Sequence, residues 1–316
     1  MRKAALIYNP VSGQPNVRRE AQIAAALAEL RRGGVAADAI MTRAPGSAGE
    51  QARKAVSQGC DAVLACGGDG TVNEILQGMI HTEAAIGVVP LGTANALALD
   101  LGLPAAADKA ARMLLDAKPV RIAVGRISYS RRDGQASSRY FTVAAGIGPD
   151  AHLMYHLNAQ LKRRYGYPVY IIEALRVWAT HKYPFFEVEL CTDTGNRRER
   201  VSQVLAVRIA DFGRMLRRLA PGAALRHNHL RLVLFKTRSR LQYLRYMSAV
   251  LFGIEPRIRE IEVLDAATIE CRLPSGTDPR TYVEADGELL GTLPAKLEIV
   301  PDAVNLLMPP GAIGTC

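Results

Sequence analysis

A glycine-rich run between a buried strand and a helix constrains the fold of this chain more than any other feature. The run spans residues 66–74 and reads Cys-Gly-Gly-Asp-Gly-Thr-Val-Asn-Glu. The apolar residues 62–65 before it predict a strand, and residues 72–80 predict a helix. Glycine lets backbone N–H groups approach an anion closely and adopt positive φ angles, and the following helix directs its positive end to the same place. The run therefore predicts a turn that binds phosphate.

Asp69 places a carboxylate inside this turn, which a bare phosphate site would not favour. Beside phosphates, a carboxylate is suited to hold a hydrated Mg²⁺ or to orient a reacting group. Thr71, Asn73 and Glu74 add polar side chains within one helical turn. A turn that only needs glycine is the structural alternative, but it does not explain why these polar residues occur in one short block.

Strands and helices alternate over residues 1–120. Strands are predicted at 4–8, 36–42, 61–65 and 85–89, and helices at 17–30, 46–58, 72–80, 94–101 and 105–117. Such alternation predicts a parallel sheet with helices on both faces, in which ligands bind at the carboxyl ends of the strands. Residues 9–13, 66–74 and 90–98 each follow a predicted strand. The pattern therefore predicts that these three segments meet at one edge of the sheet.

The pattern changes to short strands from about residue 118. Residues 120–127 and 140–148 alternate like the strands of a hairpin around a polar loop at 131–138, and a helical stretch covers 150–179 with an interruption around 166–168. Further strands are predicted at 185–191, 204–209, 230–235, 258–264, 268–272, 282–285 and 297–300. We expect an antiparallel sandwich for this part, followed by a return of residues 303–308 to the first domain.

Three ordered motifs resemble those of the diacylglycerol kinase catalytic family, which includes bacterial lipid kinases and is related to sphingosine and ceramide kinases. Residues 66–74 resemble its GGDGT motif, residues 9–13 (Asn-Pro-Val-Ser-Gly) its NPxSG motif, and residues 90–98 (Pro-Leu-Gly-Thr-Ala-Asn-Ala-Leu-Ala) its PLGTxNxxA motif. The resemblance implies an α/β fold with an N-terminal parallel-sheet nucleotide-binding domain and a C-terminal antiparallel β-sandwich domain. The expected ATP-binding domain comprises residues 1–120 and 301–316, and the expected lipid-substrate domain comprises residues 121–300.

By this resemblance, ATP and Mg²⁺ are the cofactors, and the three motifs together with one further strand end bind the nucleotide. The residues implied are Asn9, Pro10, Val11, Ser12, Gly13, Thr42, Gly67, Gly68, Asp69, Gly70, Thr71, Val72, Asn73, Glu74 and Thr93. Asp69 is expected to organise the Mg²⁺ as part of the catalytic machinery. The structural alternative for Thr42 is a polar residue that simply ends a strand.

Residues 282–288 read Tyr-Val-Glu-Ala-Asp-Gly-Glu and resemble the Asp-Gly-Glu motif of the family. Gly287 permits a tight turn that presents Asp286 and Glu288 to one site, where a close like-charge pair raises one pKa and creates a base for a hydroxyl group. The resemblance implies that Glu288 accepts the proton and that Asp286 is its partner. The structural alternative is a type I′ hairpin turn, for which Asp-Gly is a common signature.

One segment departs from the family pattern. The family carries acids that hold a structural Mg²⁺ after an Ala-Pro-like segment, whereas residues 220–230 here contain His227, Asn228 and His229 and no acid. Imidazoles are poor ligands for Mg²⁺, so no structural metal site is predicted. Some branches that act on sphingoid lipids also depart from the bacterial pattern at this point.

Charge is concentrated in the second half of the chain. The net charge is +10, and residues 121–316 hold 28 of the 40 basic residues but 19 of the 30 acidic ones. Residues 212–254 contain nine Arg or Lys, no acid, and interleaved apolar side chains. This composition suits binding to an anionic membrane surface. Nucleic acid is the competing partner, but the sequence contains no nucleic-acid-binding motif. The structural alternative is a basic face that is simply solvated. The five scattered cysteines favour neither a disulfide framework nor zinc.

The sequence therefore predicts a lipid kinase that transfers the γ-phosphate of ATP to the hydroxyl of diacylglycerol or a related lipid, including sphingoid lipids. With no apolar run of about 18 residues and no signal peptide, we expect a cytoplasmic protein peripherally associated with the membrane. NAD kinase is an alternative that explains residues 66–74 but not 9–13 or 93–95. A non-catalytic nucleotide sensor is a third reading, and edge strands of the second domain would allow pairing into a homodimer.

Overall fold

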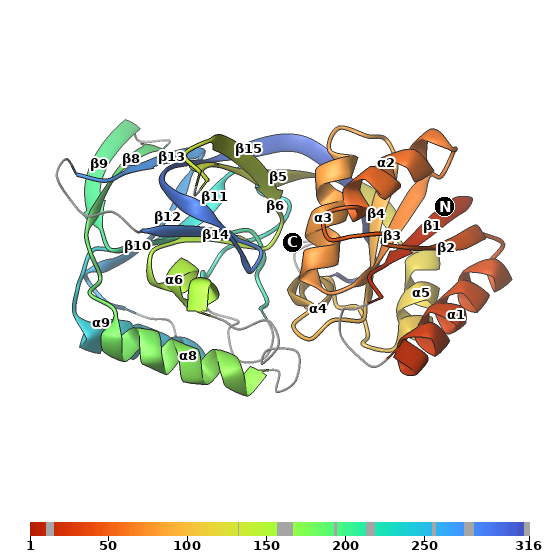
Figure 1. Ribbon diagram of the computed structural model, residues 1–316, viewed down its shortest axis with the longest axis horizontal. Coiled ribbons are helices and arrows are strands. Elements are labelled where there is room, and N and C mark those ends of the chain that lie inside the picture. The colour runs from red at the N-terminus through yellow and green to blue at the C-terminus, as the bar shows by residue number, and fades with distance from the viewer. Residues whose placement is uncertain are drawn as a thin grey trace. The chain divides into compact units, whose positions relative to one another are not determined.

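The chain divides into two units, the first formed by Met1–Val124 with Pro301–Cys316 and the second by Gly125–Val300. The computed structural model (Figure 1) describes residues 1–10, 16–131, 133–156, 167–192, 195–212, 219–254, 257–274 and 281–312. The chain passes from the first unit to the second within strand β5 (Lys118–Ser130) and returns within strand β15 (Glu288–Met308).

A parallel sheet forms the centre of the first unit, with strand order β2-β1-β3-β4-β15. Its strands are β1 (Lys3–Tyr8), β2 (Ala36–Met41), β3 (Ala62–Gly67), β4 (Ala85–Pro90) and the end of β15. Every residue of β3 and β4 is buried, as expected for central strands covered on both faces. The parallel sheet predicted from the alternation of strands and helices is confirmed.

Helices cover both faces of this sheet (Figure 1). They are α1 (Asn16–Arg32), α2 (Ala48–Ser57), α3 (Asp69–Met79), α4 (Ala96–Asp100) and α5 (Ala107–Leu115). Helix α1 packs on α5, and α2 packs on α3. The buried face of α5 is made by Ala107, Ala110, Ala111 and Leu114, which have the i, i+3, i+4, i+7 spacing of a helix with one buried side. Small alanines at these positions let the helix lie close to its neighbours.

Two glycines allow α2 and α3 to touch through their backbones. A Cβ added at Gly78 would lie 2.0 Å from the carbonyl oxygen of Gly49, and one added at Gly49 would lie 2.6 Å from the carbonyl oxygen of Glu74. We therefore expect Gly78→Ala to destabilise the protein by ~1–3 kcal/mol, because backbone atoms must move apart. Chemical denaturation measures this. Gly33→Ala is the control, since its Cβ would meet only the movable end of the Leu115 side chain; an equal loss in both variants would contradict the explanation.

The second unit is an antiparallel sandwich, as the sequence predicts. One sheet has the order β12-β11-β10-β7-β14-β15, and the other contains β9, β8, β13, β15, β5 and β6. The strands not yet placed are β6 (Ala136–Phe141), β7 (Ala144–Ile147), β8 (Phe186–Thr192), β9 (Gly195–Val201), β10 (Gln203–Val207), β11 (Leu230–Phe235), β12 (Ile261–Ala266), β13 (Thr268–Arg272) and β14 (Tyr282–Ala285). Strand β15 belongs to both sheets, because Glu288–Thr292 pairs with β14 and Ala295–Glu298 pairs with β13. Phe141, Phe186 and Leu232 are fully buried in the core between the sheets.

The strand predicted at residues 140–148 is wrong as a single element. Strand β6 pairs with β5, whereas β7 pairs with β10 and β14. The break has a visible cause, since the carboxylate of Asp286 accepts the backbone N–H groups of Thr142, Val143 and Ala144. Residues 142 and 143 therefore leave the ladder, and the chain crosses from one sheet to the other.

Among the described residues, the helices that accompany the sandwich are α6 (Pro149–His156), α8 (Tyr167–Thr180) and α9 (Arg240–Leu251). Residues 157–166 of the predicted helical stretch lie outside the described residues, and α9 is a helix that the sequence pattern did not indicate. Within the described ranges, no helix combines the length and apolar character needed to span a bilayer.

Candidate active site

The carboxyl ends of four parallel strands gather the predicted nucleotide-binding residues of the first unit. Tyr8 at the end of β1 is in register with Met41 of β2 and Cys66 of β3, and Gly67 is in register with Pro90 of β4. The residues that follow these strands, among them Asn9, Thr42, Gly68 and Thr93, therefore lie along one edge of the sheet. Val11, Ser12 and Gly13 of the first motif lie outside the described residues.

Helix α3 begins at Asp69, three residues earlier than the sequence predicts. Gly68 precedes it with φ −94° and ψ −172°, and both Thr71 and Val72 donate their backbone N–H to the Gly68 carbonyl, at 3.0 and 3.2 Å. The first N–H groups of a helix lack intrahelical acceptors. Among the described residues, the backbone N–H of Gly70 is therefore available to an acceptor outside the helix. The partial positive charge at the start of the helix favours an anion as that acceptor.

The glycines of this turn serve close packing, and the expectation of positive φ angles at Gly67, Gly68 and Gly70 is wrong. A Cβ at Gly67 would lie 2.4 Å from Oγ1 of Thr71. A Cβ at Gly92 would lie 2.4 Å from the Cα of Gly68, so the turn after β3 and the turn after β4 touch backbone to backbone. Side chains are excluded where the two motifs meet.

Two carboxylates of the predicted site hold neighbouring helices. The Asp69 carboxylate accepts the N–H of Leu97 at the start of α4, at 3.3 Å, and the Glu74 carboxylate accepts the N–H of Ala48 at the start of α2, also at 3.3 Å. Asn73 is fully buried, and its side chain accepts a hydrogen bond from Gln77.

Half-buried Asp69 stands in the same helical turn as the Gly70 amide. The first unit therefore offers a backbone amide for a phosphate oxygen and a carboxylate suited to Mg²⁺. Thr93 is exposed and Thr42 is buried, with its backbone N–H donated to the Tyr8 carbonyl at 2.9 Å.

A two-residue turn joins β14 to β15 in the second unit. Asp286 has φ 48° and Gly287 has φ 79°, the left-handed pair of a type I′ turn. The Asp286 carboxylate accepts the N–H groups of Thr142, Val143 and Ala144 at 3.2, 2.9 and 3.1 Å. Three amide donors fix this carboxylate, so it anchors the turn to the segment between β6 and β7.

Glu288 follows the turn and is paired with an arginine. Its Oε2 lies 2.8 Å from Nη2 of Arg139 on β6, and both side chains are partly exposed. The pair fixes the direction of the Glu288 carboxylate. Arg139 was not among the residues singled out in the sequence, because a lone arginine in a polar strand gives no signal.

A different pair of carboxyl groups is buried beside the turn. Asp150 lies at the start of α6, so close to Gly146 that a Cβ there would lie 1.6 Å from Oδ2 of Asp150, and Glu284 is the strand residue paired with Gly146. Oδ1 of Asp150 is buried and has no hydrogen-bond partner among the described residues. Burial raises the pKa of Asp150 to about 7, and burial together with the nearby Asp150 raises the pKa of Glu284 well above its usual range. Glu284 also accepts the N–H of Gly287 at 2.9 Å, which ties the pair to the turn.

The raised pKa values predict how stability depends on pH. A carboxyl group with a raised pKa in the folded state binds a proton that the unfolded chain has already lost, so its contribution to stability declines as pH rises from about 4 to about 7. We expect the stability of Asp150→Asn, measured relative to the unmodified protein by chemical denaturation, to improve steadily across this range. A difference in stability that is the same at pH 4.5 and pH 7.5 would contradict the assignment.

Two family models match most of the chain. Residues 3–127 match the family described as diacylglycerol kinase catalytic domain, and residues 142–308 match the family described as YegS C-terminal NAD kinase beta sandwich-like domain. The chain belongs to the diacylglycerol kinase catalytic-domain family. The resemblance inferred from the three motifs is confirmed, and so is the combination of a parallel-sheet unit with a sandwich unit.

Relatives in this family match over nearly the full chain. A diacylglycerol kinase of Bacillus subtilis is 25% identical over 314 residues, covering 98% of this chain and 97% of the relative. A diacylglycerol kinase of Mycobacterium tuberculosis is 27% identical, with 97% and 95% covered. The crystal structure of a diacylglycerol kinase from Bacillus anthracis superposes with a TM-score of 0.74 at 19% identity and covers 98% of both chains. That structural likeness supports the fold.

Arg208 organises the 225–229 loop, which contains His227, Asn228 and His229. Its guanidinium is buried and donates to the carbonyl oxygens of Leu225, His227 and His229, at 2.8, 2.8 and 2.6 Å. Burial lowers the pKa of Arg208 to about 10, so the side chain is still a cation at neutral pH. His229 lies 3.4 Å from Asp265. A cation of the chain itself thus satisfies the carbonyl groups of the 225–229 loop.

Three imidazoles of the second unit gather around His152, two residues after Asp150 in the chain. Nε2 of His152 lies 3.1 Å from Nε2 of His156, and the ring of His152 lies 4.6 Å from that of His181. Burial and the neighbouring imidazoles lower the pKa of His181 to about 4. Burial also lowers the pKa of His152. No group of three metal-ligating side chains suited to a metal ion occurs in the described ranges.

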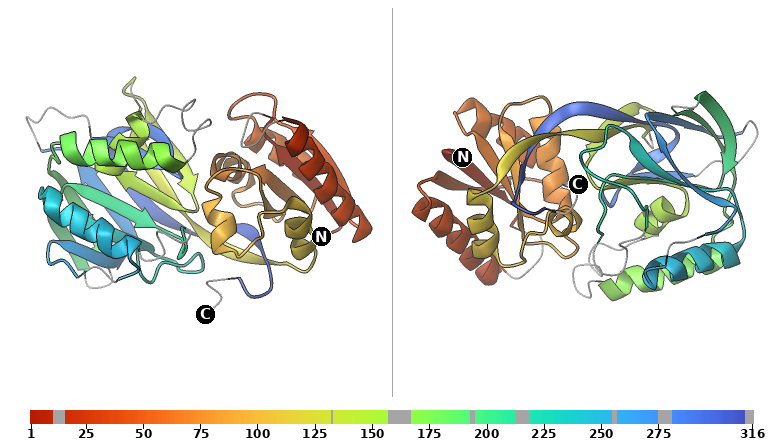
Figure 2. Two further views of the ribbon diagram at one scale, coloured as in Figure 1. Left: turned by 90° about the horizontal axis from the view of Figure 1, so that it is seen from below. Right: turned by 180° about the vertical axis from the view of Figure 1, so that it is seen from behind.

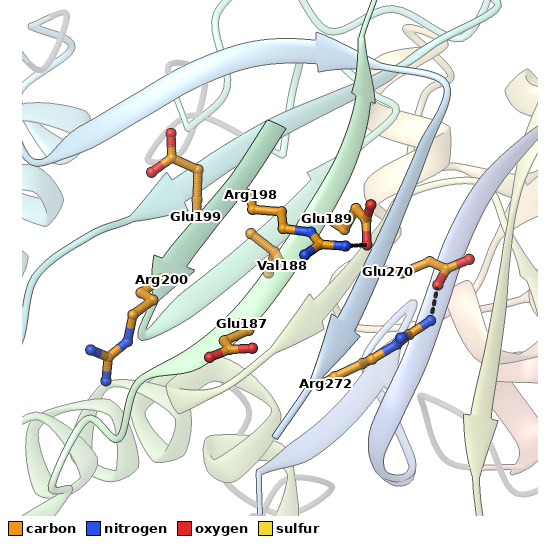
Figure 3. A pocket seen from close by; sticks show the side chains of 8 residues that line it. All are labelled: Glu187, Val188, Glu189, Arg198, Glu199, Arg200, Glu270 and Arg272. Carbon is orange, nitrogen blue, oxygen red and sulfur yellow. Dashed lines mark hydrogen bonds and ion pairs between the residues drawn. The ribbon is translucent and has the colours of Figure 1, made fainter. Parts of the chain in front are cut away.

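A hollow of about 510 Å³ lies on β8, β9 and β13 in the second unit (Figure 3). Seven of its eight lining side chains are charged, and four of them form two ion pairs, Arg198 with Glu189 and Arg272 with Glu270. None of these residues belongs to the motifs of the diacylglycerol kinase family. The pairing of charges indicates a solvated sheet surface rather than a ligand site.

Proposed function

We propose that this chain is an ATP-dependent lipid kinase that transfers the γ-phosphate to the hydroxyl of diacylglycerol or a related lipid at a membrane surface. The observation that carries the proposal is the edge of the first unit, where strand ends bring Asn9, Thr42, Asp69 and Thr93 to the start of α3. This edge belongs to the region that matches the diacylglycerol kinase catalytic domain. Full-length similarity to chains named diacylglycerol kinase supports the same reading.

In the proposed site, the Gly70 amide and the positive end of α3 bind phosphate oxygens, together with Asn9 and Thr93. Asp69, whose direction is set by the N–H of Leu97, holds Mg²⁺. When bound, MgATP supplies the phosphoryl group and neutralises charge that develops during transfer. Backbone contact between Gly68 and Gly92 keeps side chains out of the phosphate region.

The second unit supplies the proton acceptor in this proposal. Glu288 accepts the proton of the lipid hydroxyl, since phosphoryl transfer needs a group that orients and deprotonates the attacking oxygen. Arg139 directs the Glu288 carboxylate through the contact of 2.8 Å. Asp286 is a positioning residue, because its carboxylate is engaged by the backbone of residues 142–144 and holds the turn in place.

A panel of acceptors tests the proposal. Pure protein is incubated with Mg²⁺ and ATP labelled at the γ-position, with detergent-dispersed diacylglycerol, monoacylglycerol, ceramide or sphingosine, and with NAD in a separate reaction. We expect label in one of the lipids, which also names the substrate class. Label in NAD would replace the proposal by NAD kinase activity. Binding of ATP with no labelled lipid would favour a nucleotide sensor.

A further inference from the structure

Helix α9 carries two apolar stripes, and only one of them is covered. Tyr243, Tyr246 and Val250 are buried against a core that contains Phe235 and Val233. On another side, the residues left exposed are Leu241, Leu244, Met247 and Leu251, at 64%, 40%, 37% and 45%. Their spacing of three, three and four residues places them along one line of the helix. Phe252 and Ile254, just after α9, are 80% and 60% exposed.

Helix α8 extends this apolar surface. Ile171, Ile172 and Leu175 are exposed on α8. The two helices lie side by side (Figure 2), and Trp178 of α8 donates its indole N–H to the carbonyl of Arg240 at 2.9 Å. We name the nine exposed side chains the α8/α9 face; they are Ile171, Ile172, Leu175, Leu241, Leu244, Met247, Leu251, Phe252 and Ile254. Exposed apolar patches of this kind mark interaction sites.

Positive charge accompanies the α8/α9 face. Arg176 and Lys182 on or just after α8, and Arg238, Arg240 and Arg245 on or just before α9, are exposed. Residues 238–254 contain no acid, and Glu173, the acid of α8, is engaged by Arg176 at 3.4 Å. Apolar side chains flanked by arginine and lysine fit the boundary between lipid tails and anionic headgroups, because long basic side chains can lie along the surface with their charge in water.

We propose that the α8/α9 face is the surface by which this protein docks onto an anionic lipid bilayer. This inference rests on the proposed function, in which the acceptor of the phosphoryl group is a lipid, and it adds the surface by which the protein reaches that lipid. The docked helices would lie flat in the headgroup region with their apolar side chains inserted. The charge complementarity specifies an anionic bilayer rather than a neutral one.

Co-sedimentation with vesicles tests the proposal, using phosphatidylcholine with or without phosphatidylglycerol. We expect binding to the anionic vesicles, at least about tenfold weaker binding to neutral ones, and at least about tenfold weaker binding for the variant Leu241→Ser/Leu251→Ser/Phe252→Ser. Arg245→Glu is expected to lose binding similarly. Arg198→Glu is the matched control, since Arg198 is an exposed arginine of β9, outside the α8/α9 face. Trp178, the single tryptophan, gives a fluorescence signal for docking.

Thermal unfolding confirms that each variant is folded, and activity towards lipid dispersed in detergent separates this inference from the proposed function. Retained activity in detergent with lost vesicle binding supports docking through the α8/α9 face. Vesicle binding without kinase activity towards any lipid overturns the proposed function and leaves the docking surface standing. Equal vesicle binding by the triple variant and the unmodified protein overturns the inference. The inference is also overturned if the unmodified protein is a dimer, the triple variant is a monomer, and both bind vesicles equally.

Discussion

Replacing Glu288 by glutamine is expected to reduce phosphoryl transfer about 10²–10⁴-fold, the usual contribution of a general base. Glutamine keeps the length of the side chain and can still accept a hydrogen bond from Arg139, so the turn and the sandwich are expected to stay folded. ATP affinity is expected to stay unchanged, because the proposed nucleotide-binding residues belong to the other unit. Steady-state kinetics with the accepted lipid, together with equilibrium binding of ATP, measure both quantities.

Glu270→Gln is the matched control for this prediction. Glu270 is also a strand glutamate paired with an arginine, here Arg272, but it lies in the charged hollow of β8, β9 and β13. We expect its kinetics to match those of the unmodified protein. Normal turnover of Glu288→Gln would remove Glu288 from the proton-acceptor role, and loss of activity in both variants would point to a general requirement for charge in the sandwich.

Replacing Arg208 by methionine is expected to destabilise the protein by ~3–5 kcal/mol. The substitution removes a buried charged donor and leaves its carbonyl acceptors without a partner. The guanidinium serves the carbonyl groups of Leu225, His227 and His229 at once. Methionine fills similar volume but offers no donor. Chemical denaturation measures the loss, and the 225–229 loop is expected to become accessible to protease at lower denaturant concentrations.

Arg198→Met is the control for the Arg208 variant, since the Arg198 side chain is 83% exposed and makes one ion pair. Its stability is expected to change by less than ~1 kcal/mol. Arg208→Lys is informative as well, because an ammonium group cannot reproduce the fork of guanidinium donors. Stability of Arg208→Met equal to that of the Arg198 variant would mean that the loop does not depend on this side chain.

The parallel sheet of the first unit could be predicted because its periodicity is local. Residues 62–65 and 85–89 are short and apolar, and Gly67 and Pro90 follow them closely, so the sequence favours buried strands. The start of α3 was less accessible, since glycine is a poor helix former and Gly70 obscured the first turn. The roles of Asp69 and Glu74 in holding the starts of α4 and α2 depend on partners that only the fold brings close.

Several features of the sandwich depend on contacts between distant residues, which sequence patterns do not predict. The Asp-Gly turn was recognisable, but the carboxylate of Asp286 finds its three amides more than 140 residues away in the chain. Helix α9 could not be predicted because apolar residues lie on two of its sides, so its sequence lacks the single apolar stripe of an amphipathic helix. Glu284 gave the one usable sequence signal for the buried acid pair, since it is an acid inside the predicted strand 282–285. In the structure all four residues of this strand are buried. Asp150 becomes its partner only through the pairing of β7 with β14.

The most direct measurement is the conversion of diacylglycerol and ATP by the purified chain in the presence of Mg²⁺, with both products quantified. The proposed function predicts that the lipid phosphate ester and ADP form in equal amounts, and that both are lost in Glu288→Gln. Formation of ADP without phosphorylated lipid, or of phosphorylated NAD in place of phosphorylated lipid, would contradict the assignment of this chain as a lipid kinase.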